Sequence, residues 1–219
     1  MATAADLSII IPTLNAAAFL PGTLAALEAR DEVIVVDGGS TDGTPELAAA
    51  RGARVLIAPR GRGSQLAAGI AAATRPWLLL LHADTCLSPD WRLARPGDTG
   101  HAGYFRFVLD SADPRARRLE RLVGWRSRVL GLPYGDQGLL IHRDLLRSVG
   151  GMRPLPLMED VDLVRRIGRH RLVPLAADAV TSARKWETQG YLRRSARNLF
   201  CLSLWFAGVS PEKIQRIYG

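Results

Sequence analysis

The chain has 219 residues, of which 47% are hydrophobic and 23% charged, values typical of a folded domain with a sizeable core. Its formal net charge is +8, but no dense basic run with interleaved aromatic residues occurs, which disfavours nucleic-acid binding. The two cysteines, Cys86 and Cys201, match no zinc or redox spacing, and no stretch approaches the roughly 20 apolar residues of a transmembrane helix.

The first half of the sequence alternates strand and helix signals. The predicted strands are 7–11, 33–36, 54–58 and 77–81, and the predicted helices are about 15–30, 44–51 and 63–73. Such βαβ alternation predicts an α/β fold with a mostly parallel, doubly wound sheet and helices on both of its faces.

The pattern changes after Asp84. The predicted strands are then 103–109 and 138–142, and the predicted helices are 114–130, 158–169 and 190–207. The helix over 114–130 is basic and amphipathic.

The apolar segment 199–209 is too short to span a membrane and lies beside several arginines. It fits two alternatives, packing on the core or lying on a membrane surface. The C-terminal helix and the segment 125–132 are also candidates for a homodimer surface, with core packing as the alternative. Because the N-terminus lacks the basic segment of a signal peptide, we expect a cytoplasmic protein, free or peripheral to the inner membrane face.

A carboxylate ends the second predicted strand. The β-branched run 33–36 stops at Asp37, and Gly38 begins a glycine-rich turn. A buried parallel strand would place Asp37 at the carboxyl edge of the sheet, where open α/β folds bind ligands. The glycines let a ligand approach the backbone closely, so a sugar nucleotide would fit there.

The strand over 78–81 delivers a second carboxylate, Asp84, to the same edge. A buried carboxylate needs a partner, and a divalent cation held between Asp84 and a diphosphate would supply one. The alternative is that Asp84 caps the next turn through Thr85 or Ser88. His82 faces the same side along an extended chain, and both ligation and packing are open for it.

A third pair of carboxylates, Glu159 and Asp160, opens the predicted helix over 158–169. The helix dipole favours acidic residues there, so in one interpretation both act only as caps. In the other, apolar neighbours turn one carboxylate into a cleft, where it takes a proton from an acceptor hydroxyl as general base.

These segments together resemble family 2 glycosyltransferases, which have the GT-A fold. The matching segments are Ser8–Asn15, Val35–Asp42, His82–Asp84 and Glu159–Asp160, in the order and spacing of that family. The resemblance implies a single GT-A domain over 1–219. Its nucleotide-sugar-binding half would be about 1–95, its acceptor and catalytic half about 96–190, and its C-terminal helical tail about 190–219.

The resemblance implies a donor site at the ends of the first two strands. Pro12, Thr13 and Asn15 match the edge that lines the nucleoside pocket. Asp37, followed by Gly38, matches the aspartate that contacts the base or ribose.

The resemblance also implies a metal and a base. His82, Ala83 and Asp84 match the Asp-X-Asp metal motif, with histidine in place of the first aspartate, so Mg²⁺ or Mn²⁺ would bind at Asp84 and His82. Asp160, preceded by Glu159, matches the catalytic base of an inverting transfer.

Three further segments resemble a narrower bacterial subgroup of small family 2 members that is associated with arsenosugar biosynthesis. They are Gly61–Gly69, Pro133–Gly138 and Arg184–Glu187. In the first, Arg62 and Gln65 are expected near the donor phosphate or nucleoside. A plain helix-start turn is the alternative.

The other two segments supply the expected acceptor side. Tyr134, Asp136 and Gln137 offer an aromatic ring and two polar groups for a sugar, unless they form only a polar turn. Arg184 and Trp186 resemble an Arg-Trp element near the acceptor side of larger relatives, with a surface cation–aromatic pair as the alternative.

A nucleotide-sugar donor, by default UDP-linked with GDP as the alternative, and a small-molecule or lipid-linked acceptor complete this hypothesis. Two other classes compete with it. A nucleotidyltransferase would carry a Gly/Arg/Lys signature directly after the first strand, where this chain has 12–15, Pro-Thr-Leu-Asn. A non-catalytic nucleotide-binding or membrane-peripheral protein would not need Asp37, Asp84 and Asp160 together.

Overall fold

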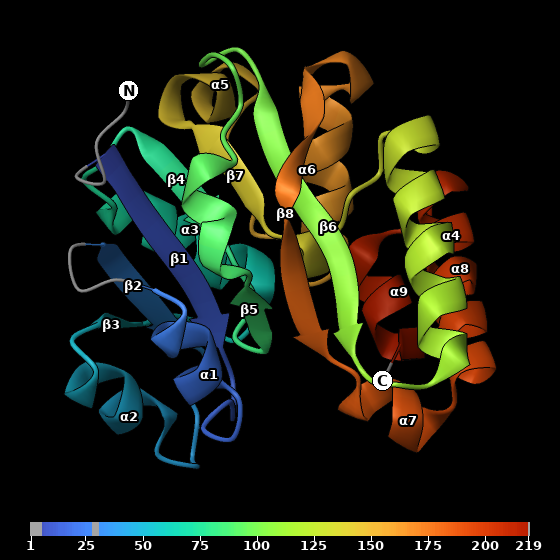
Figure 1. The fold of residues 1–219 in the computed structure, drawn as a ribbon, viewed down its shortest axis with the longest axis horizontal. Coiled ribbons are helices and arrows are strands. Elements are labelled where there is room, and N and C mark those ends of the chain that lie inside the picture. The colour runs from blue at the N-terminus through green and yellow to red at the C-terminus, as the bar shows by residue number, and fades with distance from the viewer. Residues whose placement is uncertain (1–5, 28–30, 219) are drawn as a thin grey trace.

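Uniformly apolar strands form the centre of the molecule. The computed structural model describes residues 6–27 and 31–218, and these residues build a mixed eight-stranded sheet (Figure 1). In sheet order the strands are β3 (Arg54–Ile57), β2 (Glu32–Asp37), β1 (Leu7–Thr13), β4 (Trp77–Leu80), β7 (Leu139–His142), β6 (Ala102–Asp110), β8 (Leu172–Ser182) and β5 (Thr85–Leu87).

The first four strands of this order run parallel, as the βαβ alternation predicts. β1 is buried along its whole length between β2 and β4. The register pairs Thr13 with Asp37, so the carboxyl ends of β1 and β2 meet at one edge of the sheet.

The second part of the sheet is mixed. β7 pairs antiparallel with β4 and β6, β6 pairs parallel with β8, and the short β5 pairs antiparallel with β8. The α/β class is therefore confirmed, and the parallel arrangement predicted for most of the sheet holds for its first four strands.

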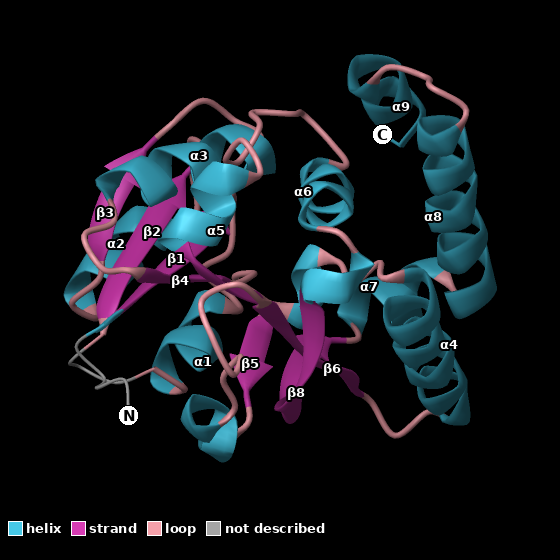
Figure 2. Cartoon of the chain, turned by 90° about the horizontal axis from the view of Figure 1, so that it is seen from above, coloured by secondary structure: helices cyan, strands magenta, loops and turns pink. Residues whose placement is uncertain are grey.

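Helices cover both faces of the sheet, as predicted (Figure 2). Their bounds are α1 (Leu20–Ala25), α2 (Thr44–Ala50), α3 (Arg62–Ala72), α4 (Pro114–Leu130), α5 (Arg143–Ser148), α6 (Glu159–Ile167), α7 (Arg184–Gln189), α8 (Tyr191–Phe206) and α9 (Pro211–Tyr218). α1 and α2 share one core with β1, through Leu20 and Ala48, whereas α3, α5 and α6 pack on the opposite face through Leu66, Leu146 and Leu163.

A smaller third core joins β6, α4, α7 and α8. It contains Phe107, Leu109, Val123, Trp186 and Tyr191. α4 and α8 lie side by side in both views, away from the parallel strands (Figures 1 and 2). Within the described ranges, no helix is both long and apolar enough to cross a membrane.

The longest element that the sequence pattern did not predict is β8. It contains Pro174 and several alanines, residues with weak strand preference, and its conformation depends on pairing with β6. The shorter elements β5, α5, α7 and α9 were not predicted either.

The predicted helix over 15–30 begins later than expected, at Leu20. Asn15 has a left-handed backbone with φ 50°, and side chains of the next loop hold the segment before the helix. Ala16 N–H donates to Thr44 Oγ1 and Ala17 N–H to Asp42 Oδ2, both at 2.9 Å. Residues 28–30 of the predicted helix lie outside the described residues.

Candidate active site

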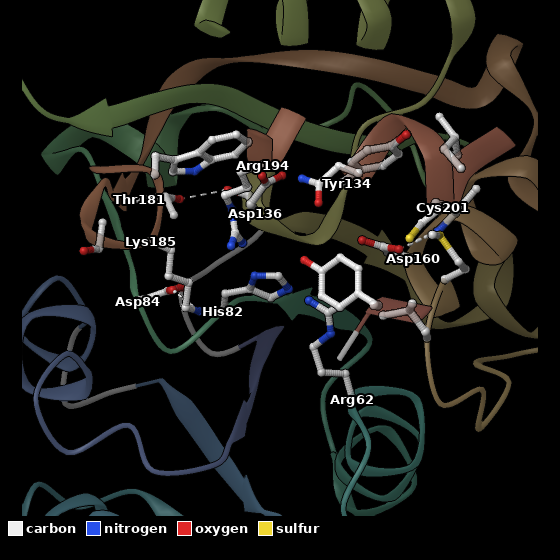
Figure 3. A pocket seen from close by; sticks show the side chains of 18 residues that line it. Arg62, His82, Asp84, Tyr134, Asp136, Asp160, Thr181, Lys185, Arg194 and Cys201 are labelled. Atoms are coloured by element: carbon white, nitrogen blue, oxygen red, sulfur yellow. Dashed lines mark hydrogen bonds and ion pairs between the residues drawn. The ribbon is translucent and has the colours of Figure 1, made fainter. Parts of the chain in front are cut away.

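Two adjoining cavities open where the carboxyl ends of the parallel strands face α6–α9. The first, cavity A, is lined by the predicted residues Pro12, Thr13, Asn15, Gln65 and Ala83, and also by Arg60, Pro156 and Gln215. The second, cavity B, is lined by Tyr134, Asp136, Met158, Asp160, Trp186, Asn198 and Tyr218, among others (Figure 3). Arg62, His82, Asp84 and Lys185 line both. The structure therefore brings together residues from four separate parts of the sequence.

Asp37 lies behind the wall of cavity A and does not line it. Its carboxylate accepts hydrogen bonds from Thr13 Oγ1 at 2.9 Å, from the N–H groups of Gly39 and Ser40 at 2.8 and 2.7 Å, and from the Ser40 hydroxyl. Burial raises the pKa of Asp37, but the bonds from Ser40, Thr13 and Gly39 hold it below its ordinary value. In this structure Asp37 shapes the turn, and direct contact with a nucleoside stays a prediction.

Gln65 ties α3 to the ends of β1 and β2. Its buried amide donates to the carbonyl oxygens of Thr13 and Val36, each at 2.7 Å. The turn at Gly38 packs closely over it, since a Cβ at Gly38 would lie 3.2 Å from Gln65 Nε2. Asn15 fixes the outer rim, where its Oδ1 accepts the N–H of Thr41 at 2.9 Å.

His82 follows β4 and lies between the two cavities. Burial, together with the nearby Arg62 and Lys185 cations, lowers the pKa of His82 to about 4, despite the opposing Asp84 and Asp160. The imidazole is therefore neutral at neutral pH. Ala83 is held from behind, because its carbonyl oxygen accepts the Thr23 hydroxyl at 2.8 Å.

Asp84 is paired with a cation of the chain itself. Lys185 Nζ lies 3.3 Å from Asp84 Oδ2 (Figure 3). Burial raises the pKa of Asp84, but His82 and Lys185 together hold it below its ordinary value. The capping alternative does not describe the site, since the Thr85 hydroxyl bonds the Thr181 hydroxyl and the Ser88 hydroxyl accepts the N–H of Asp178.

The predicted metal ligands do not form a metal site by themselves. Asp84 and His82 offer at most two ligands, and the ammonium of Lys185 already lies on Asp84. In the described part of the chain, no three His, Cys, Asp or Glu side chains gather closely enough to hold a metal ion. The residues present therefore fit a divalent cation poorly.

The carboxylates of α6 start the helix from a left-handed residue, Met158, with φ 64°. Glu159 points to α3, where its Oε1 lies 2.8 Å from Arg62 Nε. It is 1% exposed, and burial raises its pKa to about 7 against the effect of Arg62. Its Oε2 has no hydrogen-bond partner among the described residues. Glu159 is therefore a buried partner of Arg62 and does not line cavity A or cavity B.

Asp160 faces cavity B. Its Oδ2 accepts the N–H of Gly135 at 2.9 Å and its Oδ1 accepts the N–H of Val161 at 2.8 Å. Asp160 thus bonds the first turn of its helix and also lines the cavity, and its role as general base stays a prediction.

The loop before α6 is fixed against α3. A Cβ at Gly63 would lie 2.5 Å from the carbonyl oxygen of Leu155 and 2.8 Å from that of Arg153, so only glycine allows this approach of the two backbones. Arg153 also pairs with Asp162 of α6 at 3.0 Å. Arg62 and Asp160 are therefore carried by elements in direct backbone contact.

Gly135 is a site residue that sequence reasoning missed. A Cβ there would lie 2.4 Å from His82 Nε2 and 3.4 Å from Asp160 Oδ2. Its N–H donates to Asp160, and the lack of a side chain leaves room for His82, so both residues contact the backbone at this glycine. The only indication in the sequence was its position within Pro133–Gly138, one of the segments that resemble the bacterial subgroup.

Tyr134 and Asp136 both line cavity B, and contact with an acceptor stays a prediction for them. The Arg126 guanidinium lies 3.5 Å from the centre of the Tyr134 ring, and burial raises the pKa of Tyr134 to about 12. Burial likewise raises the pKa of Asp136 to about 6. The Tyr134 hydroxyl and Asp136 Oδ1 are buried without a hydrogen-bond partner in the described ranges.

Gln137 points away from both cavities. Its Oε1 accepts the Ser127 hydroxyl at 2.8 Å and its Nε2 donates to the carbonyl oxygen of Phe105 at 3.1 Å. It is 1% exposed, so it braces α4 against β6 and does not face an acceptor as predicted.

In the segment 184–186, the side chains that line a cavity are not the two that were predicted. Trp186 lines cavity B and stacks on Tyr191 with ring centres 6.2 Å apart. Arg184 lines neither cavity and lies 5.9 Å from the Phe19 ring, the surface cation–aromatic pair of the alternative interpretation. Lys185 between them lines both cavities, although no feature of the sequence distinguishes it from its neighbours.

Residues 8–95 match the family model described as Glycosyl transferase family 2. The matched residues include β2, β3 and β4, all but the first residue of β1, and the His82–Asp84 segment. An uncharacterized glycosyltransferase of Mycobacterium tuberculosis is 44% identical over 78 residues, which cover 35% of this chain and 36% of that protein. A PGL/p-HBAD biosynthesis glycosyltransferase of Mycobacterium bovis is 40% identical over 99 residues, 40% of this chain and 39% of that protein. The matching part thus spans little more than a third of each relative.

Solved structures resemble the fold over a longer range. A mannosyltransferase of Pyrobaculum calidifontis in complex with GDP-Man and Mn²⁺ has a TM-score of 0.62 at 21% identity, covering 89% of this chain and 61% of that one. Glucosyl-3-phosphoglycerate synthase of Mycobacterium tuberculosis in complex with Mn²⁺ and UDP-glucose has a TM-score of 0.55 at 20% identity, covering 80% and 69%. The chain has the GT-A fold, as the sequence resemblance predicted.

Proposed function

We propose that this chain is a glycosyltransferase that moves a sugar from a nucleotide-sugar donor to a hydroxyl acceptor, with Asp160 as general base. One observation carries the proposal. Cavity A is lined mainly by residues of the segment that matches the family model, cavity B contains Asp160, and the two share Arg62, His82, Asp84 and Lys185. A donor in cavity A would therefore present its reacting carbon next to an acceptor in cavity B.

The donor class follows from cavity A. It lies at the carboxyl ends of β1 and β2, where α/β folds bind nucleotides, and Arg60 and Arg62 line it. We propose a UDP-sugar as donor. The solved relatives carry UDP-glucose in one case and GDP-Man in the other, so both nucleotides belong in the assay.

The proposed reaction inverts the anomeric centre. Asp160 takes the proton of the acceptor hydroxyl, the acceptor oxygen forms a bond to the anomeric carbon, and the bond from that carbon to the diphosphate breaks with its electron pair. The negative charge then rests on the diphosphate oxygen, beside Arg62 and Lys185. His82 is neutral and adds no charge, so it serves to orient and pack.

The sequence also predicts Mg²⁺ or Mn²⁺ as cofactor, and the solved relatives contain Mn²⁺. Since Asp84 and His82 do not make a metal site on their own, such a cation would have to enter with the diphosphate of the donor. No step of the proposed mechanism is assigned to it.

The acceptor would be a polar hydroxyl compound, small or lipid-linked. Cavity B presents buried polar atoms that lack a partner among the described residues, on Tyr134, Asp136, Arg194 and Asn198. Acceptor hydroxyls would satisfy them. The narrower resemblance to the arsenosugar subgroup stays a prediction, which a panel of acceptors that includes arsenic-bearing sugars would test.

We also propose that α4 and α8 bring the protein to the inner face of a membrane. Trp125 on α4 is 53% exposed, and Leu199 and Phe200 on α8 are 64% and 54% exposed. Arginines on the same helices complement anionic lipid, which favours a membrane over a second copy of the chain. Co-sedimentation with phosphatidylserine vesicles, reduced by Phe200→Glu, would support this proposal, and a dimer by light scattering without lipid binding would replace it with a homodimer surface.

A transfer assay tests the proposed function. Asp160→Asn should lower the rate of sugar transfer by about 10²–10⁴-fold, the usual contribution of a general base, and leave nucleotide binding nearly unchanged. Asp144→Asn is the matched control, because Asp144 lies on α5 with its side chain 76% exposed. Sugar transfer by Asp160→Asn at the wild-type rate would remove Asp160 as the base, and release of pyrophosphate in place of a nucleoside diphosphate would indicate a nucleotidyltransferase.

A further inference from the structure

Lys185 has an unusual place for a lysine in this chain. Only two of the 29 basic residues are lysines, and the other, Lys213, is exposed on α9. Lys185 lines both cavities and lies 3.3 Å from Asp84 Oδ2. The proposed mechanism uses the charge of Lys185 but assigns no role to the contact of its ammonium with Asp84.

Backbone contacts hold the two residues together. Ser182, the last residue of β8, donates its N–H to the carbonyl oxygen of Asp84 at 3.1 Å. Next to it, Thr85 pairs with Thr181 in the ladder of β5 and β8, and their hydroxyls lie 3.0 Å apart. α7 starts directly after this junction, so the backbone of Lys185 is held at a fixed position near Asp84.

The two cations shared by the cavities are held differently. Arg62 is fixed by the buried Glu159 at 2.8 Å, which is 1% exposed. Lys185 is 60% exposed at its side chain and bonds a carboxylate that is 18% exposed. An ammonium is a compact charge on a flexible side chain, so that of Lys185 can bond a phosphate oxygen without any movement of the backbone.

Asp84 therefore already has the positive partner that its motif would take from a metal. We infer that Lys185 is the resident cation of the donor site: its ammonium, positioned by Asp84, bonds the diphosphate of the donor, and the protein binds nucleoside diphosphates without a divalent cation. This inference rests on the proposed function, since it assumes that cavity A takes a nucleotide sugar.

Calorimetric titration with UDP and GDP tests it, each in EDTA and in Mn²⁺. Wild-type protein should bind one of them in EDTA, with a dissociation constant within about threefold of that in Mn²⁺. Lys185→Ala should weaken binding in EDTA about tenfold or more, as expected for the loss of a charge-assisted hydrogen bond. It should also gain a dependence on Mn²⁺, because Asp84 is then free to bind the cation. Lys185→Arg should keep most of the binding in EDTA.

Lys213→Ala is the matched control and should bind like wild type, because it removes the other lysine from an exposed position. Binding by wild type only in Mn²⁺ would overturn the inference and leave the proposed function intact. Equal binding of Lys185→Ala and wild type in EDTA would overturn it as well. If wild type binds neither UDP nor GDP in either buffer, the proposed donor site fails and the inference fails with it. The comparison of wild-type binding in EDTA and in Mn²⁺ needs no variant, so it tests the inference even if Lys185→Ala does not fold.

Discussion

Cavities A and B differ in how the polar groups around them are satisfied. Behind and along the wall of cavity A, the side chains of Thr13, Asn15, Asp37 and Gln65 all have partners within the protein. Around cavity B, buried atoms of Tyr134, Asp136, Arg194 and Asn198 have none among the described residues. The wall of cavity A is thus complete before a ligand arrives, whereas the wall of cavity B would gain bonds from the proposed acceptor.

This difference has an energetic meaning. A buried polar group without a partner costs about 1–3 kcal/mol, so cavity B carries a cost that an acceptor with matching hydroxyls removes. Selectivity should therefore depend more on cavity B, because an acceptor that leaves these groups unpaired does not recover that cost.

The largest expected effect comes from Gly135→Ala. The new Cβ would lie 2.4 Å from His82 Nε2, so the backbone that holds Asp160 must shift. We expect sugar transfer to fall more than about 100-fold, since small displacements of catalytic groups have effects of this size. Gly97→Ala is the control, because a Cβ at Gly97 meets no atom within 4 Å. If Gly135→Ala weakens nucleotide binding as strongly as it slows sugar transfer, the two cavities do not act as separate sites.

Gln65→Ala is expected to affect stability next most strongly. It removes the donor for the buried carbonyl oxygens of Thr13 and Val36 and should lower the free energy of unfolding by about 2–3 kcal/mol. Urea denaturation measures this change. Gln215→Ala, on the exposed part of the same cavity wall, should leave the free energy of unfolding unchanged. A similar loss in both variants would contradict the idea that Gln65 braces a preformed wall.

The pH dependence of stability should sharpen the comparison. Burial raises the pKa of Asp136 to about 6 and that of Glu159 to about 7, whereas that of His82 is lowered to about 4. His82 offsets one of the two carboxyl groups, so between about pH 4 and 7 the folded protein still binds more protons than the unfolded chain, by less than two. Stability should therefore fall as the pH rises through this window. The pKa of Asp37 and Asp84 is lowered, so their stabilising effect is lost only as the pH falls below about 4.

Asp136→Asn should make the stability curve flatter between about pH 4 and 6, because it removes one of the two carboxyl groups with a raised pKa and leaves Glu159 and His82, whose effects oppose each other. Thermal melts of both proteins across this range measure the effect. Parallel curves for wild type and Asp136→Asn would show that Asp136 titrates as an ordinary carboxylate.

The smallest effect is expected at Met158, whose left-handed backbone precedes Glu159. Met158→Gly should change the free energy of unfolding by less than about 1 kcal/mol, because relief of the backbone strain offsets the lost packing. Met158→Val should cost more, about 2 kcal/mol, since a β-branched residue tolerates this conformation poorly. Chemical denaturation compares the two, and equal values would argue against strain at this position.

Local sequence patterns were sufficient for much of the fold. The uninterrupted apolar runs of β1, β2 and β4 predicted buried parallel strands, and the amphipathic pattern of 114–130 gave both ends of α4. β8 was missed because its strand conformation comes from its neighbours, not from its own residues.

The candidate site was predictable where a carboxylate ends a strand or begins a helix. Asp84 and Asp160 both line a cavity, as the position of each suggested. The partners of such groups were not predictable. That Asp37 bonds Thr13 depends on the register of β1 against β2, and that Asp84 meets Lys185 depends on residues 101 positions apart in the sequence. Gln137 and Arg184 were assigned to the acceptor side but line neither cavity. A short polar segment does not reveal which of its side chains faces inward.

The contact at Gly63 has a consequence for how this protein could be retargeted. Since α3 and the loop before α6 touch through their backbones, Arg62 and Asp160 are set by one shared support that tolerates little change. The opposite wall is built from helices α7, α8 and α9, whose side chains reach cavity B from segments outside the sheet. Directed evolution toward a new acceptor should accordingly accumulate its substitutions on those three helices, and leave the support of Arg62 and Asp160 as it is.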